Sequence, residues 1–275
     1  MPELSNDLDL IARELFSGYE TGQMVDILPS SHLGFKLDAA YEVEAKLKQF
    51  REAAGHNAVG RKVGYANRAM WRVLKLETLV WGHMYDDTVH YAGSNSAELT
   101  VLRPRSLKIE PEIVFGLKQP IRHEGLDATA ALAHVDWLAL GFELIDCPFP
   151  GWKFQPSDFV ASFGLHAALM IGEKIQVQPE LIPQLVDELP CFKVRMLKNG
   201  EFVEEGSGKN SLKSPALCLG ELGAAIVRRF PAEPLHAGEI VSSGTLTAGH
   251  PTDKGDLWTA EVEGISLPSL TLRLT

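Results

Sequence analysis

Strand-like runs dominate the chain after about residue 79, and they do not alternate regularly with helices. The runs cover residues 109–117, 137–145, 192–197, 239–242, 257–262 and 267–274. Asn199-Gly200 joins two strand-like segments and is the strongest short-range signal for a β-hairpin. Because regular βαβ alternation is missing, the pattern predicts an α+β domain rather than a doubly wound α/β domain.

The part of the chain before residue 79 has more helical patterning. Apolar residues recur at helical spacing over residues 8–16, and a second helix is expected over residues 38–54, where Gly55 stops it. A short strand is expected at 59–65. We therefore expect two parts, a helix-rich N-terminal region over residues 1–78 and a larger domain over residues 79–275.

The charge of the chain limits its partners. Lys and Arg number 26 and Asp and Glu number 36, which gives a formal net charge of −10. Such a surface repels nucleic acid and anionic membranes, so neither is an expected partner. The N-terminus shows no basic or apolar signal segment, and the three cysteines form no CxxC pair. We expect a cytoplasmic protein.

Two glutamates flank a proline in the segment Glu110-Pro111-Glu112. Residues two apart on a strand share a face, so both carboxylates point the same way and repel each other unless a cation lies between them. Pro111 cannot donate to a ladder, which favours an edge strand or a bulge. The alternative is that both glutamates face solvent while Ile109 and Ile113 face the core.

A third acid lies in an apolar strand. Glu143 follows the run Trp137–Phe142, where a carboxylate is costly unless it is paired or bound to metal. Three carboxylates without a nearby Cys or His suit a hard cation, so Mg²⁺ or Mn²⁺ fits better than Zn²⁺. About three coordination positions would stay open for a bidentate ligand and a water molecule.

These two strands resemble the fumarylacetoacetate hydrolase superfamily. Two further segments are similar to that family, namely Asn199-Gly200-Glu201 with the following Gly206-Ser207-Gly208 and Ser214-Pro215, and the segment from Leu235 to Thr247. The resemblance spans about residues 60 to 275. It implies a mixed β-roll or sandwich domain with a smaller helical α/β region at the N-terminus.

Within this superfamily the chain is most similar to the branch of 2-keto-4-pentenoate hydratases and 4-oxalocrotonate decarboxylases. The segments that carry this likeness are 60–65, 69–71 and 82–87. The resemblance implies that Glu110, Glu112 and Glu143 are metal ligands. It also makes Lys62 and Asp86 acid/base candidates, with Asp87 as the alternative if the register shifts by one residue.

Three more residues are candidates for substrate contacts. Thr245 could hydrogen-bond a substrate carboxylate, and Gly244 would let the backbone approach closely; the alternative is a plain turn. Lys153 is a candidate near the site, although a loop lysine is commonly exposed.

The acid/base role of Lys62 requires a pKa near neutrality. If Lys62 is partly buried beside a metal, its pKa would be lowered toward that range.

The resemblance implies a Mg²⁺- or Mn²⁺-dependent hydratase that adds water to a short unsaturated 2-oxo acid, such as 2-hydroxypenta-2,4-dienoate, through a metal-stabilised enolate. The alternatives are decarboxylation of a 4-oxalocrotonate-like diacid, hydrolysis of an acylpyruvate, or a catalytically altered partner of such an enzyme. We expect a homo-oligomer that could also associate with a related hydratase or decarboxylase.

The chain departs from the branch at three places, with Cys147-Pro148 after Asp146, with Ala161-Ser162-Phe163-Gly164, and with His83 and Tyr85 near the acid candidate. The first two departures concern the distal substrate pocket, so the sequence does not name the substrate. The run from Phe159 to Gly172 lacks charged side chains and is too short to span a bilayer, so we expect buried core. His134 and His166 have apolar neighbours in the sequence and are expected to be core or interface residues.

Overall fold

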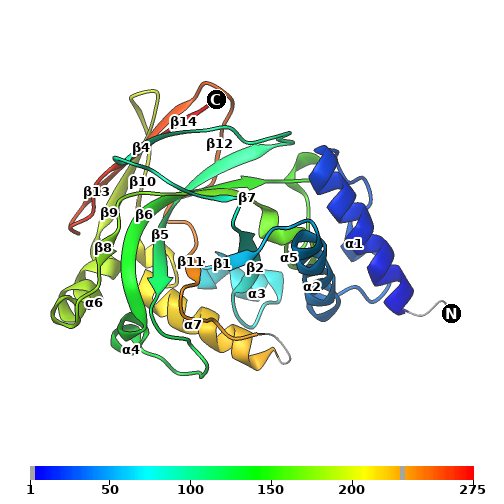
Figure 1. The fold of residues 1–275 in the computed structure, drawn as a ribbon, viewed down its shortest axis with the longest axis horizontal. Helices are drawn as coiled ribbons and strands as arrows, with labels where there is room; N and C mark the ends of the chain where they lie inside the picture. Colours follow the sequence, from blue (N-terminus) through cyan, green and yellow to red (C-terminus); the bar gives the residue numbers. More distant parts are fainter. Residues whose placement is uncertain (1–3, 230–232) are drawn as a thin grey trace.

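A computed structural model describes residues 4–229 and 233–275 as two β-sheets with flanking helices (Figure 1). The helices are α1 (Leu4–Thr21), α2 (Leu37–Ala53), α3 (Trp71–Leu74), α4 (Ala128–Ala133), α5 (Pro156–Ala161), α6 (Ile182–Cys191) and α7 (Pro215–Arg228). The mixed content confirms the predicted α+β class, because the helices do not alternate with parallel strands.

The larger sheet runs in the order β2-β1-β11-β5-β6-β7-β3, with β12 paired to β5 and β8 paired to β6. Its strands are β1 (Ala58–Gly64), β2 (Val80–Tyr85), β3 (Val89–Tyr91), β5 (Leu107–Leu117), β6 (Val135–Asp146), β7 (His166–Ile171), β8 (Ile175–Gln176), β11 (Ile240–Ser242) and β12 (His250–Pro251). Figure 1 shows that β5 and β6 are long and strongly curved.

The smaller sheet runs in the order β10-β9-β13-β14-β4. Its strands are β4 (Ser96–Leu99), β9 (Lys193–Lys198), β10 (Glu201–Ser207), β13 (Leu257–Glu263) and β14 (Leu270–Leu274). The hairpin predicted at Asn199-Gly200 joins β9 and β10, and both turn residues have positive φ, 54° and 86°. That conformation is what a two-residue hairpin turn requires, so the prediction is confirmed.

The two faces of the larger sheet carry different layers. One face packs against the helices in the main core, with Ile113 and Phe115 beside Leu219 and Leu222 of α7 in the same buried cluster. The opposite face holds a smaller buried cluster; its members are Met84, Val89, Val114, Trp137, Ala139, Leu169, Ile171 and Ile240. Since side chains alternate along a strand, Glu110 and Glu112 lie on the same face as Val114. The small cluster therefore forms the apolar base beside the glutamates.

Pro111 does not mark an edge strand, and that expectation is wrong. Strand β5 is central, between β11 and β6, and its register with β6 is regular at Pro111, which pairs with Phe142. On the other side, β11 pairs with β5 only as far as Val114, and β12 begins to pair at Ile109. The proline lies in this gap between two partner segments, so its missing N–H removes no ladder bond.

The N-terminal helices α1 and α2 pack against each other, and α2 packs on α5, at one end of the molecule (Figure 1). Strand β1, which precedes the proposed division at residues 78 and 79, pairs with β2 and β11 of the larger sheet. The division itself stays a prediction. The run from Phe159 to Gly172 is almost wholly buried within α5 and β7, which confirms that it belongs to the core.

No helix within residues 4–229 and 233–275 has the length and apolar character that crossing a membrane requires.

The close approach of β1 and β11 depends on the missing side chain of Gly60. A Cβ atom at this position would lie 1.9 Å from the carbonyl oxygen of Ile240 on the paired strand. We expect Gly60→Ala to lower the free energy of unfolding by about 1–3 kcal/mol, because the two strands must separate to admit the methyl group. Urea denaturation measures the loss. Gly93→Ala, at a position where a Cβ meets no atom within 4 Å, is the matched control and should be nearly neutral.

Candidate metal and acid/base site

Three glutamates meet on the inner face of the curved sheet. Glu110 and Glu143 are direct partners in the antiparallel pairing of β5 and β6, and Glu112 follows two residues later on the same face of β5. One carboxylate oxygen from each of the three lies within 4.8 Å of the others. Glu112 and Glu143 are fully buried. The sequence therefore predicted the shared face correctly, and the structure adds that all three carboxylates converge.

Glu112 has one oxygen fixed and one oxygen free. Its Oε2 accepts hydrogen bonds from the backbone N–H of Gly244, at 2.9 Å, and from the hydroxyl of Ser242. Its Oε1 is buried and has no hydrogen-bond partner among the described residues. A buried, unpaired carboxylate oxygen is costly in an apolar environment. The free oxygen is therefore available as a metal ligand.

Glu143 is held between two basic side chains. Its Oε2 accepts a hydrogen bond from Lys62 Nζ at 2.8 Å, and its Oε1 lies 2.9 Å from Nδ1 of His166. Nε2 of His166 lies 3.0 Å from the hydroxyl of Thr88. Lys62 belongs to β1 and Glu143 to β6, with β11 and β5 between them. Only the curl of the sheet brings these two side chains together.

The three glutamate carboxylates outnumber the basic side chains around them. Burial raises the pKa of Glu110 to about 7, and the Glu143 carboxylate adds to that shift while Lys62 and Lys108 oppose it. Burial and the Glu143 charge raise the pKa of Glu112 well above its ordinary value. Burial also acts to raise the pKa of Glu143, but Lys62 and His166 lower it overall. One lysine thus faces three carboxylates, and a divalent cation would offset the remaining negative charge.

The lowered pKa expected for Lys62 beside a bound metal stays a prediction. The side chain is 2% exposed, and burial acts to lower its pKa. In the chain itself the charges of Glu143, Glu112 and Glu110 outweigh burial and raise the pKa above the ordinary value.

The donor set fits a hard dication. It consists of carboxylate oxygens, one of which has no other partner, and within the described residues no thiolate joins it. Mg²⁺ and Mn²⁺ prefer such ligands and keep open positions for water or substrate. Glu110, Glu112 and Glu143 are the residues that would hold the ion.

A cavity of about 490 Å³ opens from this group, with Lys62 and Glu110 in its wall. Gly244 and Thr245 line it, in agreement with their predicted place near the site. The remaining polar lining consists of Asn67, Glu204, Asn210 and Thr247, and the aromatic lining consists of Tyr65, Trp152, Phe154 and Phe159.

Two predicted residues lie elsewhere. Asp86 accepts hydrogen bonds from the backbone and side chain of Asn57 and lies near His56 and Asp87, in a separate and largely exposed cluster. Lys153 is exposed and is not part of the cavity wall, although its neighbours Trp152 and Phe154 are. Asp86 follows β2 at the end that pairs with the start of β1, whereas Lys62 lies near the other end of β1. The strand register thus separates Asp86 from the glutamates.

His166 is the site residue that sequence reasoning missed. It was expected to be a core or interface histidine, and it is buried, but its ring bonds to Glu143. Its neighbours in sequence are apolar, so no local signal points to a polar partner. The pairing of β6 with β7 brings it beside Glu143, and only the tertiary structure defines that pairing.

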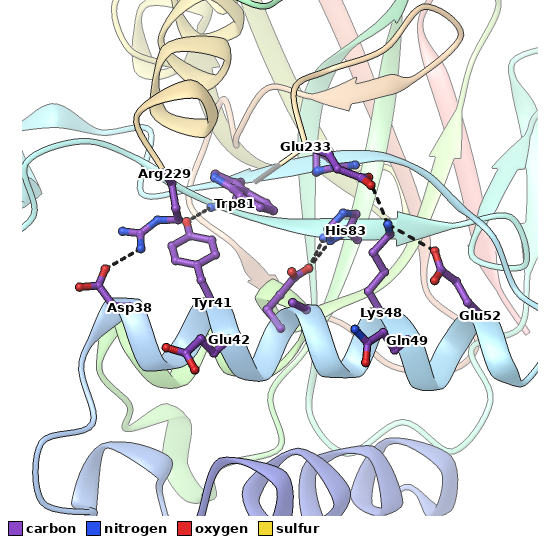
Figure 2. Close-up of a pocket in the computed structure, with 13 residues that line it drawn as sticks. Asp38, Tyr41, Glu42, Lys48, Gln49, Glu52, Trp81, His83, Arg229 and Glu233 are labelled. Atoms are coloured by element: carbon purple, nitrogen blue, oxygen red, sulfur yellow. Dashed lines mark hydrogen bonds and ion pairs between the residues drawn. The ribbon is translucent and has the colours of Figure 1, made fainter. Parts of the chain in front are cut away.

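A second cavity, of about 590 Å³, lies between α2 and the outer face of β1 and β2 (Figure 2). Figure 2 shows that its charged groups pair with one another: Lys48 bridges Glu52 and Glu233, each at 3.3 Å, and Arg229 meets Asp38 at 2.6 Å. These pairs connect α2 with the segments after α7. The cavity contains none of the three clustered glutamates.

A buried acid–imidazole pair lies in the wall of this second cavity. Glu44 accepts hydrogen bonds from the backbone N–H of His83, at 3.1 Å, and from its Nδ1. Burial acts to raise the pKa of Glu44, but His83 and Arg61 hold it below its ordinary value. Burial lowers the pKa of His83, against the opposing charge of Glu44. Near neutral pH the pair is a carboxylate and a neutral imidazole.

Comparison with known proteins agrees with this geometry. The family described as "Fumarylacetoacetate (FAA) hydrolase C-terminal" matches residues 59–273, so the chain belongs to this family. A 2-hydroxyhexa-2,4-dienoate hydratase of Comamonas testosteroni is 25% identical over 261 residues, which is 94% of each chain. A 4-oxalocrotonate decarboxylase of a Pseudomonas species (strain CF600) is 28% identical over 82% of this chain and 81% of its own.

Solved structures share the fold. A 4-oxalocrotonate decarboxylase from Pseudomonas putida G7, complexed with magnesium and adipate, superposes with a TM-score of 0.87, at 24% identity and with 98% of each chain covered. A fumarylpyruvate hydrolase from Pseudomonas aeruginosa, in complex with Mn²⁺ and pyruvate, gives a TM-score of 0.57 at 17% identity, over 78% of this chain and 88% of its own. The predicted superfamily fold is confirmed.

Glu112→Gln tests the metal assignment. We expect the variant to be at least as stable as the wild type without added metal, because it replaces a buried carboxylate whose Oε1 has no partner within residues 4–229 and 233–275. The wild type should gain about 2–3 kcal/mol of stability in Mg²⁺ at 100 times its dissociation constant, and the variant should gain much less. Thermal denaturation with and without Mg²⁺ measures both effects. Glu98→Gln, an exposed site, is the control, and an undiminished Mg²⁺ effect in Glu112→Gln would contradict the assignment.

The Glu44–His83 pair predicts a pH dependence of stability. Both folded-state pKa values are depressed, so the unfolded chain binds more protons than the folded chain as the pH falls below the ordinary values of 6.5 and 4.5. The stabilisation is present above these values and is lost on acidification. The double variant Glu44→Gln/His83→Gln should show a shallower fall in unfolding free energy between about pH 7 and pH 4.5 than the wild type. Urea denaturation at several pH values measures the slopes, and the exposed neighbour Glu42→Gln should keep the wild-type slope.

Proposed function

We propose that the chain is a divalent-metal-dependent lyase that adds water to an unsaturated 2-oxo acid. The observation that carries this proposal is the convergence of three carboxylates within 4.8 Å, beside Lys62, with Glu110 and Lys62 in the wall of a cavity. Relatives named as hydratases, at 24–26% identity, support the reaction class.

Mg²⁺ or Mn²⁺ is the proposed cofactor, and Glu110, Glu112 and Glu143 are its proposed ligands. The names of two solved relatives, one with magnesium and adipate and one with Mn²⁺ and pyruvate, support this choice. When bound, such an ion supplies Lewis acidity toward the carboxylate and carbonyl oxygens of a 2-oxo acid.

The side chains around the glutamates have separate tasks in this proposal. Lys62 holds a proton on Nζ, 2.8 Å from Glu143, and transfers it to and from the substrate carbon chain. His166 and Thr88 fix the orientation of Glu143, and Ser242 with the N–H of Gly244 fixes Glu112. The apolar walls exclude bulk water from the proton transfer.

Asp86 is left out of this mechanism because its contacts are with Asn57 and His56. Thr245 keeps its proposed role at the substrate carboxylate, since it lines the cavity beside Gly244. Lys153 keeps no direct role, because its side chain is exposed.

Decarboxylation of a 4-oxalocrotonate-like diacid is the second candidate. The 28% identical relative is named as such a decarboxylase, and the same metal and lysine could serve that reaction. The two reactions differ in their products, since only decarboxylation releases CO₂.

A homo-oligomer and a cytoplasmic location stay predictions of the sequence. Light scattering on the purified protein measures the oligomeric state.

Lys62→Met tests the acid/base assignment. Proton transfer by a positioned side chain contributes about 10²–10⁴-fold to a rate, so kcat should fall by about that factor. Mg²⁺ should still stabilise the variant, because the three glutamates remain. The assay follows ultraviolet absorbance and CO₂ release for a panel of unsaturated 2-oxo acids, with Lys254→Met, an exposed lysine, as the control. Wild-type turnover in Lys62→Met would remove this residue from the mechanism, and CO₂ release in step with substrate loss would favour the decarboxylase.

A further inference from the structure

A row of four aromatic rings leads outward from the glutamate cluster. Lys62 Nζ, which contacts Glu143, lies 5.2 Å from the centre of the Phe159 ring. Phe159 contacts Tyr65 and Phe154, with ring centres 5.3 and 6.5 Å apart, and Phe154 contacts Trp152 at 6.3 Å. All four rings line the same cavity. A ligand held at the glutamates would therefore extend along an aromatic wall.

The same cavity offers little to a second negative charge. Lys62 is the one cation among its described lining residues, and its ammonium is already bonded to Glu143. The wall also contains the carboxylate of Glu204, held in place by the N–H of Ala248 at 3.0 Å and by Nε2 of His250 at 2.7 Å. A second carboxylate on a ligand would meet this negative charge and would find no free cation among the described residues of the wall.

One further lysine lies close to the aromatic row. Lys108 Nζ is 4.0 Å from the centre of the Trp152 ring, and the lysine is not part of the cavity wall. The contact with the ring stabilises the cation only weakly, and its charge also acts on Glu110 in the wall. Lys108 is therefore the lysine outside the wall to test as a partner for a second carboxylate.

The cavity is larger than a small oxo acid needs. A cavity of about 150 Å³ holds a benzene molecule, and this one measures about 490 Å³. It therefore has room for a 2-oxo acid head group together with a ring-sized substituent.

We infer that the substrate is a 2-oxo acid whose far end is an uncharged, apolar group about the size of a phenyl ring, seated against Phe159, Phe154 and Trp152, and that diacids are disfavoured. This inference rests on the proposed function, because it takes the glutamate cluster as the site of the oxo-acid head group. It selects among the substrate classes that the family leaves open, and it argues against a diacid decarboxylase.

Binding in excess Mg²⁺, measured by calorimetry with three non-reacting probes, tests this inference. Pyruvate carries the head group alone, 4-phenyl-2-oxobutanoate adds a phenyl ring, and 2-oxoadipate adds a second carboxylate. We expect the phenyl compound to bind about tenfold or more tighter than pyruvate, from the apolar area it buries, and 2-oxoadipate to bind no tighter than pyruvate.

The binding results distinguish failure of this inference from failure of the proposed function. If pyruvate binds in a Mg²⁺-dependent way and the phenyl ring adds no affinity, the inference is overturned and the metal site stands. Tighter binding of 2-oxoadipate than of pyruvate also overturns it, and loss of that gain in Lys108→Met would then identify the partner. If neither pyruvate nor the phenyl compound binds with Mg²⁺, the proposed function fails and the inference fails with it.

Variants of the wall add a second test. Phe154 is half-buried, so Phe154→Lys places a cation in the row and should exchange the preference, with tighter 2-oxoadipate and weaker phenyl binding. Phe154→Leu keeps an apolar wall and should lose only part of the phenyl gain, which guards against a folding defect. Phe202→Lys, at an exposed phenylalanine of β10, is the matched control and should leave all three affinities unchanged. Unchanged affinities in both Phe154 variants would contradict the proposed seat of the substituent.

Discussion

The structure depends on the repulsion among three carboxylates that two paired strands hold on one face. Glu110 and Glu143 are opposite each other in the register, and Glu112 lies two residues away, so the backbone itself forces the acids together. Burial strengthens the repulsion because little water screens it. One lysine and one histidine bond to Glu143, and two hydrogen-bond donors hold Glu112. One buried Glu112 oxygen has no partner in the part of the chain that the structure describes. A divalent cation is the group that completes this arrangement.

The curvature of the larger sheet makes the arrangement possible. Lys62 is three strands away from Glu143 in the sheet order, yet the two side chains form a 2.8 Å bond. Close approach of β1 and β11 at Gly60 and the apolar base formed by the smaller cluster support this curl. The second cavity, with its internally paired charges, belongs to the contact between α2 and the outer side of the same sheet. The N-terminal helix α2 therefore supports the strand that carries Lys62, the proposed acid/base residue.

The lining of the cavity separates the two ends of a ligand by chemistry. Near the glutamates it offers carboxylates, a lysine and backbone donors, which suit a metal-bound oxo acid. Along the wall from Phe159 it offers a row of contacting aromatic rings. The proposed substrate preference therefore rests on the aromatic wall, and the proposed metal chemistry rests on the glutamates.

Local sequence alone was enough to predict the α+β class, the helix over residues 38–54, the Asn199-Gly200 hairpin and the shared face of Glu110 and Glu112. These features follow from local periodicity and turn chemistry, which a single segment contains. Only the tertiary structure decided that Pro111 lies in a central strand, that His166 rather than Asp86 joins the glutamates, and that three carboxylates raise the pKa of Lys62. Those features depend on which strands pair and how far the sheet curls. Both depend on residues that lie far apart in the sequence, so a short segment cannot predict them.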